Sequence, residues 1–199
     1  MREGIGFTDA GNLSAYIPTN LISITDGEIV LDAKLFHVGQ KPAVDVGTSV
    51  SRVGGKTQAP VLREAAQTLR LDYAQFLELE MFTRFGGMPD TRVRDQLTRG
   101  ARIRAIFNHV QHAPMGLSDE VALVLAVQSG LLDPLPLPAV SIFRRGLRDA
   151  IDRGVPNVVR LIQDTATLDE AHKQALCEAL RQYVQSLMPA APPKTASQP

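Results

Sequence analysis

The spacing of apolar residues changes near residue 59, and this change constrains the fold more than any other feature of the sequence. Beyond it, apolar residues recur every three or four positions through a stretch with no internal Gly or Pro: Leu62, Ala66, Leu69, Tyr73, Phe76 and Leu77. Such intervals place side chains on one face of an α-helix. The sequence therefore predicts a long helix that begins near Ala59 and ends by Gly86 and Gly87.

Helical signals continue along the rest of the chain. We expect helices from Asp90 to about Val110, after Ser118, from Ala139 to Arg153, from Val155 to Asp164, and from Thr167 onward. Residues 121–127 are apolar on all sides, which predicts the buried centre of a helical bundle. Ser118 is expected to cap its helix, and Thr167 has capping-box spacing to Glu170. The last helix has one apolar side, formed by Leu176, Leu180, Tyr183, Val184 and Leu187.

Residues 1–58 have a different pattern, typical of short β-strands. The segments 21–25 and 28–31 flank an Asp-Gly dipeptide, which tolerates the positive φ of a tight hairpin turn. A third extended segment is expected from Ala43 to Val53. Because three short strands cannot bury both faces of a sheet, we interpret this part as the edge of something larger.

Three parts of the chain are therefore expected. Residues 1–58 form the β-rich edge, residues 59–188 form the helical bundle, and residues 189–199 form a tail. The tail is rich in Pro, Ala and Ser, and this composition predicts disorder.

Charge and composition exclude several classes of function. Lys and Arg number 21, as do Asp and Glu, so the chain lacks the bulk attraction that nucleic acids or anionic membranes need. The single cysteine, Cys177, permits no intrachain disulfide and fits a reducing compartment, by default the cytoplasm. No apolar stretch approaches the roughly 20 residues that span a bilayer. Neither GxxxxGK[ST] nor GxGxxG occurs, so no independent phosphate loop is expected.

The sharpest candidate site is the segment 49–55. It places Arg52 between hydroxyl-bearing residues and before a Gly-Gly turn, from which a guanidinium can present its planar fork to a phosphate. An ordinary arginine in a surface loop is the commoner alternative.

The remaining candidate residues are interpreted as structural rather than as parts of a catalytic or binding site. His109 and His112 lack the further ligands that zinc requires, so no metal site is predicted. Cys177 is expected to be buried on the last helix. Arginines at 92, 94, 99, 102 and 104 are interpreted as a solvated helix face, because no aromatic residues are interleaved for base stacking.

Three blocks of sequence together resemble the alpha subunits of F-type ATP synthases. They are SAYIPTN at 14–20, ISITDG at 22–27 and SVSRVG at 49–54, in the order and spacing of that family. The resemblance runs from about residue 10 to about residue 187 and covers only the C-terminal part of such a subunit. It implies a mostly α fold, in which the closing β-strands of a RecA-like α/β nucleotide-binding domain precede a C-terminal helical bundle.

The resemblance also implies roles for individual residues. Arg52 would reach into the catalytic site of a neighbouring beta subunit as an arginine finger that stabilises charge on the transferring γ-phosphate. Ser49 and Ser23 would place Arg52 and complete the hydrogen bonding there.

A second set of residues corresponds to the nucleotide site of the alpha subunit itself. The family has an Arg-Pro pair and a Gln-x-Gln element, where this sequence has Lys41-Pro42 and, in the second element, His109 and Gln111. We therefore expect altered contacts to the adenine of Mg-ATP or Mg-ADP, as in a divergent bacterial branch.

The partners implied are the beta subunits and the central stalk of a rotary ATP synthase coupled to protons or sodium ions. The complex would attach this chain peripherally to the inner face of the bacterial plasma membrane. Two alternatives are a free-standing helical interaction module and a truncated gene product without a role. The presence of Ser49 and Arg52 favours catalytic ancestry but fits all three interpretations.

Overall fold

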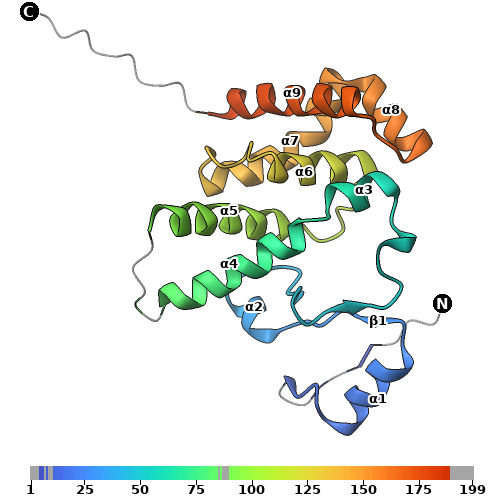
Figure 1. Ribbon diagram of the computed structural model, residues 1–199, viewed down its shortest axis with the longest axis vertical. Helices are drawn as coiled ribbons and strands as arrows, with labels where there is room; N and C mark the ends of the chain where they lie inside the picture. The colour runs from blue at the N-terminus through green and yellow to red at the C-terminus, as the bar shows by residue number, and fades with distance from the viewer. Residues whose placement is uncertain (1–4, 7, 9–10, 85, 87–89, 189–199) are drawn as a thin grey trace, which may run out of the picture.

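The computed structural model describes residues 5–6, 8, 11–84, 86 and 90–188, so the disorder predicted for residues 189–199 falls outside the described part. Its N-terminal elements are α1 (Tyr16–Ile24), β1 (Gly27–Glu28), α2 (Ala33–His37), β2 (Val50–Ser51) and the 3-10 helix η2 (Gly54–Thr57). The bundle contains α3 (Pro60–Ala65), α4 (Leu69–Arg84), α5 (Thr91–Phe107), α6 (Leu117–Gln128), α7 (Leu137–Gly154), α8 (Pro156–Thr165) and α9 (Glu170–Leu187). Figure 1 shows these helices stacked, with α4 between the N-terminal elements and the rest of the bundle.

The hairpin predicted for residues 21–31 is wrong, because residues 21–24 belong to helix α1. Pro18 lies in the first turn, where backbone N–H groups have no partner within the helix, so its ring is tolerated. Farther along, Ser23 Oγ donates to the Thr19 carbonyl at 2.8 Å. A helix satisfies its backbone groups internally, whereas a strand needs a neighbour.

β1 instead pairs with β2, far along the chain. The two strands are antiparallel, with Gly27 opposite Ser51 and Glu28 opposite Val50. A Cβ atom at Gly27 would lie 2.6 Å from the Val50 carbonyl oxygen. Glycine is therefore needed here for the close approach of β2, and not for the hairpin turn that the sequence predicted.

The extended segment predicted at 43–53 is extended only in part. Leu31 forms an isolated antiparallel bridge with Val44. The chain then turns, and the Asp45 carboxylate accepts a hydrogen bond from the Gly47 N–H at 2.8 Å. An aspartate that bonds to backbone two residues ahead stabilises a turn, so β2 begins only after it.

The single long helix predicted for the start of the bundle is two helices, separated at residues 66–68. Val61 and Ala65 of α3 are buried where this helix contacts α6. Tyr73 and Phe76 of α4 are buried where that helix contacts α5. The break lets the two helices direct their apolar residues to different partners, which one straight helix could not do.

α6 is the buried centre of the bundle, as predicted. It contacts α3, α5, α7, α8 and α9. Residues of its apolar segment are at most 4% exposed: Val121, Ala122, Leu123, Leu125, Ala126 and Val127. Contact with helices on several sides explains why the segment is apolar around most of its circumference.

α6 begins one residue before the predicted cap. Ser118 is buried inside the first turn rather than capping it. Asp119 turns back instead, and its Oδ2 accepts from the Gly116 N–H at 3.3 Å. Arg148 of α7 lies 2.9 Å from the same oxygen, so this carboxylate both caps α6 and joins it to α7.

The last helix is also capped by a residue other than the one predicted. Asp169 is the N-cap of α9, and its carboxylate accepts from the His172 N–H at 2.8 Å. Thr167 pairs with the hydroxyl of Thr165 instead, so the predicted Thr167 cap is wrong. The apolar side of α9 is buried as predicted, at Leu176, Leu180 and Val184, whereas Cys177 is only half-buried.

The fold is thus mostly helical with a small two-stranded sheet, and the predicted fold class is confirmed. The boundaries at residues 58 and 188 stay predictions. Among the helices of the described residues, none is both long enough and apolar enough to cross a bilayer.

Candidate functional site

Arg52 follows β2 at an exposed corner of the N-terminal part. Its backbone N–H donates to the Asp26 carbonyl at 2.8 Å and so fixes the end of the strand. Its side chain is exposed, with Nη1 donating to the Ser23 carbonyl at 3.2 Å and Nη2 to the Ile22 carbonyl at 2.8 Å. These carbonyls belong to the last turn of α1, where acceptors lack helical partners. The guanidinium is therefore oriented by α1 while facing solvent.

Ser49 ties two stretches of backbone together. Its hydroxyl accepts from the Val30 N–H at 3.0 Å and donates to the Asp45 carbonyl at 2.5 Å. The Ser23 hydroxyl bonds within α1, so this residue reaches Arg52 through its carbonyl and not through its side chain. Both serines thus shape the backbone that carries Arg52.

Two residues of the second predicted set, Lys41 and His109, are far apart in the sequence but hydrogen-bonded to each other in the structure. The His109 N–H donates to the Lys41 carbonyl at 2.7 Å, and the Lys41 N–H donates to Asn108 Oδ1 at 3.0 Å. Lys41 Nζ lies 4.9 Å from the centroid of the Phe36 ring. The side chains of Lys41, His109 and Gln111 are exposed, as is Pro42, so a ligand could reach them.

The ionisation of His109 depends on its surroundings. Although His109 is largely exposed, partial burial of its imidazole lowers the pKa of His109, and the positive charge of Arg144 lowers it further. The imidazole is therefore mostly in its neutral form at pH 7, in which one nitrogen donates a hydrogen bond and the other accepts.

The structure thus gathers the predicted residues into two groups. Arg52 contacts Ser23 in the last turn of α1, whereas Lys41 and His109 join the segment after α2 to the end of α5. Sequence reasoning missed Asn108, which follows the last turn of α5 and holds Lys41 in place. The helix expected to run to about Val110 ends at Phe107, so the prediction had placed Asn108 inside the helix and not at its end, where Asn often bonds to backbone.

Sequence reasoning also missed a buried polar contact beside this group. Gln40 and Tyr73 are 3% and 2% exposed, and the Tyr73 hydroxyl donates to Gln40 Oε1 at 3.4 Å. No pattern in the sequence pairs these positions, which lie in the N-terminal part and on α4.

The interpretation of the α5 arginines as a solvated face is wrong for Arg99, Arg102 and Arg104. Arg99 lies 3.4 Å from Asp72 of α4, and Arg104 pairs with Glu80 of the same helix. Arg102 instead donates to backbone carbonyls of the segment between α6 and α7. Within the described part of the chain, no group of three or more His, Cys, Asp or Glu residues lies together as a metal site would require.

Comparisons with known proteins give two family matches for this chain. A model of the C-terminal domain of the ATP synthase alpha/beta chain matches residues 58–183. A model of the nucleotide-binding domain of the ATP synthase alpha/beta family matches residues 4–51.

Individual curated relatives are described as alpha subunits of ATP synthases. ATP synthase subunit alpha 2 of Gluconobacter oxydans is 57% identical over 89% of this chain and 35% of its own length. ATP synthase subunit alpha 3 of Paraburkholderia xenovorans is 52% identical over 91% of this chain and 34% of its own length. The chain therefore spans about a third of the length of these curated relatives.

Proposed function

This chain belongs to the ATP synthase alpha/beta family, and on that premise we propose that it acts as the C-terminal part of an alpha subunit of a rotary ATP synthase. In this role it would supply an arginine to the catalytic site of an adjacent beta subunit. The complex would make or hydrolyse ATP in step with the transport of protons or sodium ions.

The position of Arg52 is the observation that carries this proposal. The residue follows a short strand, its backbone is held by Asp26, and its exposed guanidinium is oriented by two carbonyls at the end of α1. A guanidinium fork presented from outside a catalytic site can stabilise the negative charge that develops on a transferring γ-phosphoryl group. Ser49 would act at a distance by fixing the turn before β2.

We further propose that Lys41, Pro42, His109 and Gln111 contribute to a nucleotide site for Mg-ATP or Mg-ADP in the assembled complex. Lys41 and His109 are joined through their backbones and have exposed side chains. A neutral His109 can exchange hydrogen bonds with a purine ring, whereas Lys41 offers a positive charge to phosphate.

The partners proposed are beta subunits and the central stalk, with peripheral attachment to the membrane through the complex. Support comes from large apolar side chains that the N-terminal part leaves more than half exposed: Ile5, Tyr16, Ile17, Ile24, Ile29, Leu31, Phe36 and Val38. Apolar surface of this extent marks a region that further polypeptide covers, and in the assembled complex we propose that beta subunits cover part of it beside the rest of the nucleotide-binding domain.

The test of the proposal is Arg52→Lys in an alpha subunit that carries these residues, assembled with beta subunits. Lysine keeps the charge but loses the bidentate fork, so we expect steady-state ATP hydrolysis to fall about a thousandfold while the ring stays intact. Ser49→Ala should cause a smaller loss. Gel filtration of the same samples reports assembly.

Near-parental turnover in intact rings would remove Arg52 from the catalytic site. Loss of assembly would instead assign the arginine to the contact between subunits. Failure of the parental chain to co-purify with a beta subunit would favour the free-standing interaction module.

A further inference from the structure

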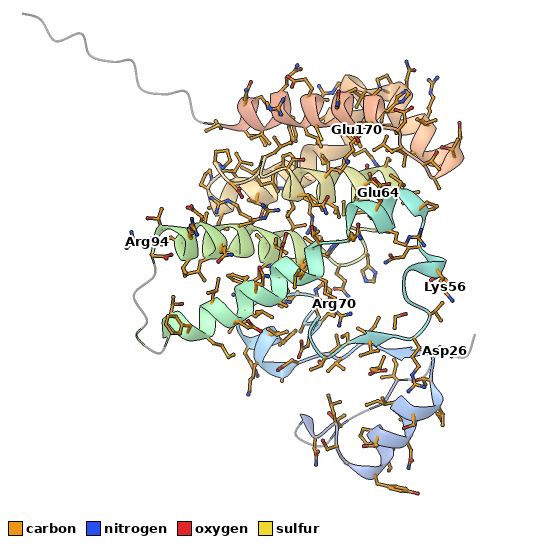
Figure 2. The ribbon with its side chains drawn as sticks, in the orientation of Figure 1. Asp26, Lys56, Glu64, Arg70, Arg94 and Glu170 are labelled. Carbon is orange, nitrogen blue, oxygen red and sulfur yellow. The ribbon has the colours of Figure 1, made fainter. Side chains whose placement is uncertain are left out.

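Two residues of α4, Arg70 and Tyr73, contact the two ends of the segment 40–49. Arg70 Nη2 donates to the Ser49 carbonyl at 3.4 Å, and the Tyr73 hydroxyl donates to Gln40 Oε1 at 3.4 Å. Positions three apart lie on the same face of a helix. Figure 2 shows Arg70 extending from the start of α4 toward the N-terminal elements. One face of α4 therefore holds both ends of this segment.

The contact at Gln40 is the more constrained of the two. Gln40 is one of few buried polar residues in the described part of the chain, and its Nε2 also donates to the Val44 carbonyl at 3.3 Å. The Tyr73 ring is fixed by its neighbours, with centroids 5.8 Å from Phe76 and 5.1 Å from Phe107. A buried amide oxygen that loses its donor is costly, so this pair sets where the segment begins.

Hydrogen bonds to Val30 link Asp45 and Ser49 of this segment, and Arg52 follows Ser49 along the chain. The Asp45 N–H donates to the Val30 carbonyl at 2.9 Å, and the Val30 N–H donates in turn to the Ser49 hydroxyl at 3.0 Å. Arg52 comes three residues after Ser49 and is bound through its own N–H to Asp26. A displacement of the segment relative to α4 would therefore displace Arg52.

We propose that Tyr73 and Arg70 are positioning residues, which fix the segment 40–49 on the helical bundle and thereby set the location of Arg52. The catalytic meaning of this positioning rests on the proposed function. The claim that these two residues fix the segment 40–49 does not rest on it, since that claim concerns contacts within this chain.

The test measures backbone amide hydrogen exchange of the full chain at Asp45, Ser49 and Arg52, whose N–H groups all donate within this network. Tyr73→Phe removes only the hydroxyl and keeps the ring. We expect exchange at the three amides to accelerate about tenfold, because the buried Gln40 oxygen is left without its donor. Arg70→Gln should accelerate exchange at Ser49 and Arg52.

Matched controls separate positioning from general destabilisation. Tyr183→Phe removes a hydroxyl that donates to the Phe143 carbonyl, within the α7–α9 contact. Arg94→Gln removes an exposed arginine near the start of α5, at the end of the helix away from Arg70 (Figure 2). Neither control should alter the three amides, and amides of α6 should keep their rates in Tyr73→Phe.

The proposal is overturned if the three amides are unchanged in Tyr73→Phe, or if they accelerate no more than the amides of α6. It is also overturned if Tyr183→Phe has the same effect. In assembled rings, Tyr73→Phe should lower kcat and leave KM unchanged. Altered exchange combined with normal turnover in Arg52→Lys would refute the proposed function while leaving the positioning intact.

Discussion

Arg104 of α5 and Glu80 of α4 form a two-point ion pair between neighbouring helices. Nη1 lies 2.8 Å from Oε1 and Nη2 lies 2.6 Å from Oε2. The guanidinium carbon also lies 4.7 Å from the centroid of the Phe76 ring. The hydrogen bonds to Glu80 are the main cause that raises the pKa of Arg104, so this arginine stays protonated throughout the physiological range.

Glu80→Ala should lower the free energy of unfolding by about 2 kcal/mol. The change leaves the partly buried charge of Arg104 without its bidentate partner, and the two side chains are 26% and 25% exposed. The cost is therefore below the roughly 3–5 kcal/mol of a fully buried pair. Urea unfolding measures it. Glu178→Ala, which breaks a solvent-exposed pair with Arg181 on α9, should cost at most about 0.5 kcal/mol. Equal effects of the two changes would contradict this account.

Leu125→Asp should unfold the domain or cost it at least about 4 kcal/mol. Leu125 is 3% exposed at the centre of the bundle, and an unpaired carboxylate there loses its hydration without gaining a partner. Thermal unfolding followed by circular dichroism is the measurement. The control is Leu71→Asp on α4, where the side chain is 59% exposed. A Leu125→Asp variant that melts like the parent would place α6 outside the core.

Periodicity predicted the bundle well because burial and spacing agree there. The apolar side of α9 and the all-apolar segment of α6 follow directly from which positions contact other helices. Periodicity did not predict the break at residues 66–68, since that break depends on which helix each face meets. Helix caps were misplaced for a related reason. Ser118 and Asp119 both suit the start of a helix, and the contact with Arg148 on another helix decides between them.

The candidate site was predictable in part. The block around Arg52 identified the residue, but nothing local indicated that carbonyls of Ile22 and Ser23 would orient its side chain. Ile22 and Ile24 have β-branched side chains that favour a strand, and the absence of a pairing neighbour outweighs that preference. The Gln40–Tyr73 contact joins distant positions, so no reading of local pattern could find it.

The pH dependence of stability should include a contribution from Asp169. Hydrogen bonds from the backbone and the side chain of His172 hold the pKa of the Asp169 carboxyl below its usual value. A carboxyl with a depressed folded pKa adds stability above its unfolded pKa of about 4, and this contribution is lost as the pH falls through the folded pKa. Asp169→Asn should therefore be less stable than the parent at pH 7, and the difference should shrink below pH of about 4. Melting temperatures of both proteins across pH 2–7 measure it, and a difference that stays constant with pH would contradict the assignment.

Arg102 joins α5 to the segment between α6 and α7. Its Nε donates to the Leu132 carbonyl at 2.8 Å, and its Nη2 donates to the Leu135 carbonyl, also at 2.8 Å. Leu132 and Leu135 are 1% and 0% exposed. The Leu132 carbonyl also accepts from the Leu135 N–H at 3.0 Å, whereas at the Leu135 carbonyl the arginine takes the place of a backbone partner.

Arg102→Met should therefore lower the free energy of unfolding by about 1–2 kcal/mol, since methionine keeps most of the packing of the stem but leaves the Leu135 carbonyl without its arginine donor. Arg102→Lys should give an intermediate loss, because one ammonium cannot reproduce the fixed spacing of Nε and Nη2. Arg92→Met, at an exposed position in the first turn of the same helix, is the matched control and should change stability by at most about 0.5 kcal/mol. Chemical unfolding gives the free energy of unfolding of each of the three variants and so ranks them. If Arg102→Met and Arg92→Met were equally stable, the sequence-based interpretation of a solvated arginine face would hold for Arg102 after all.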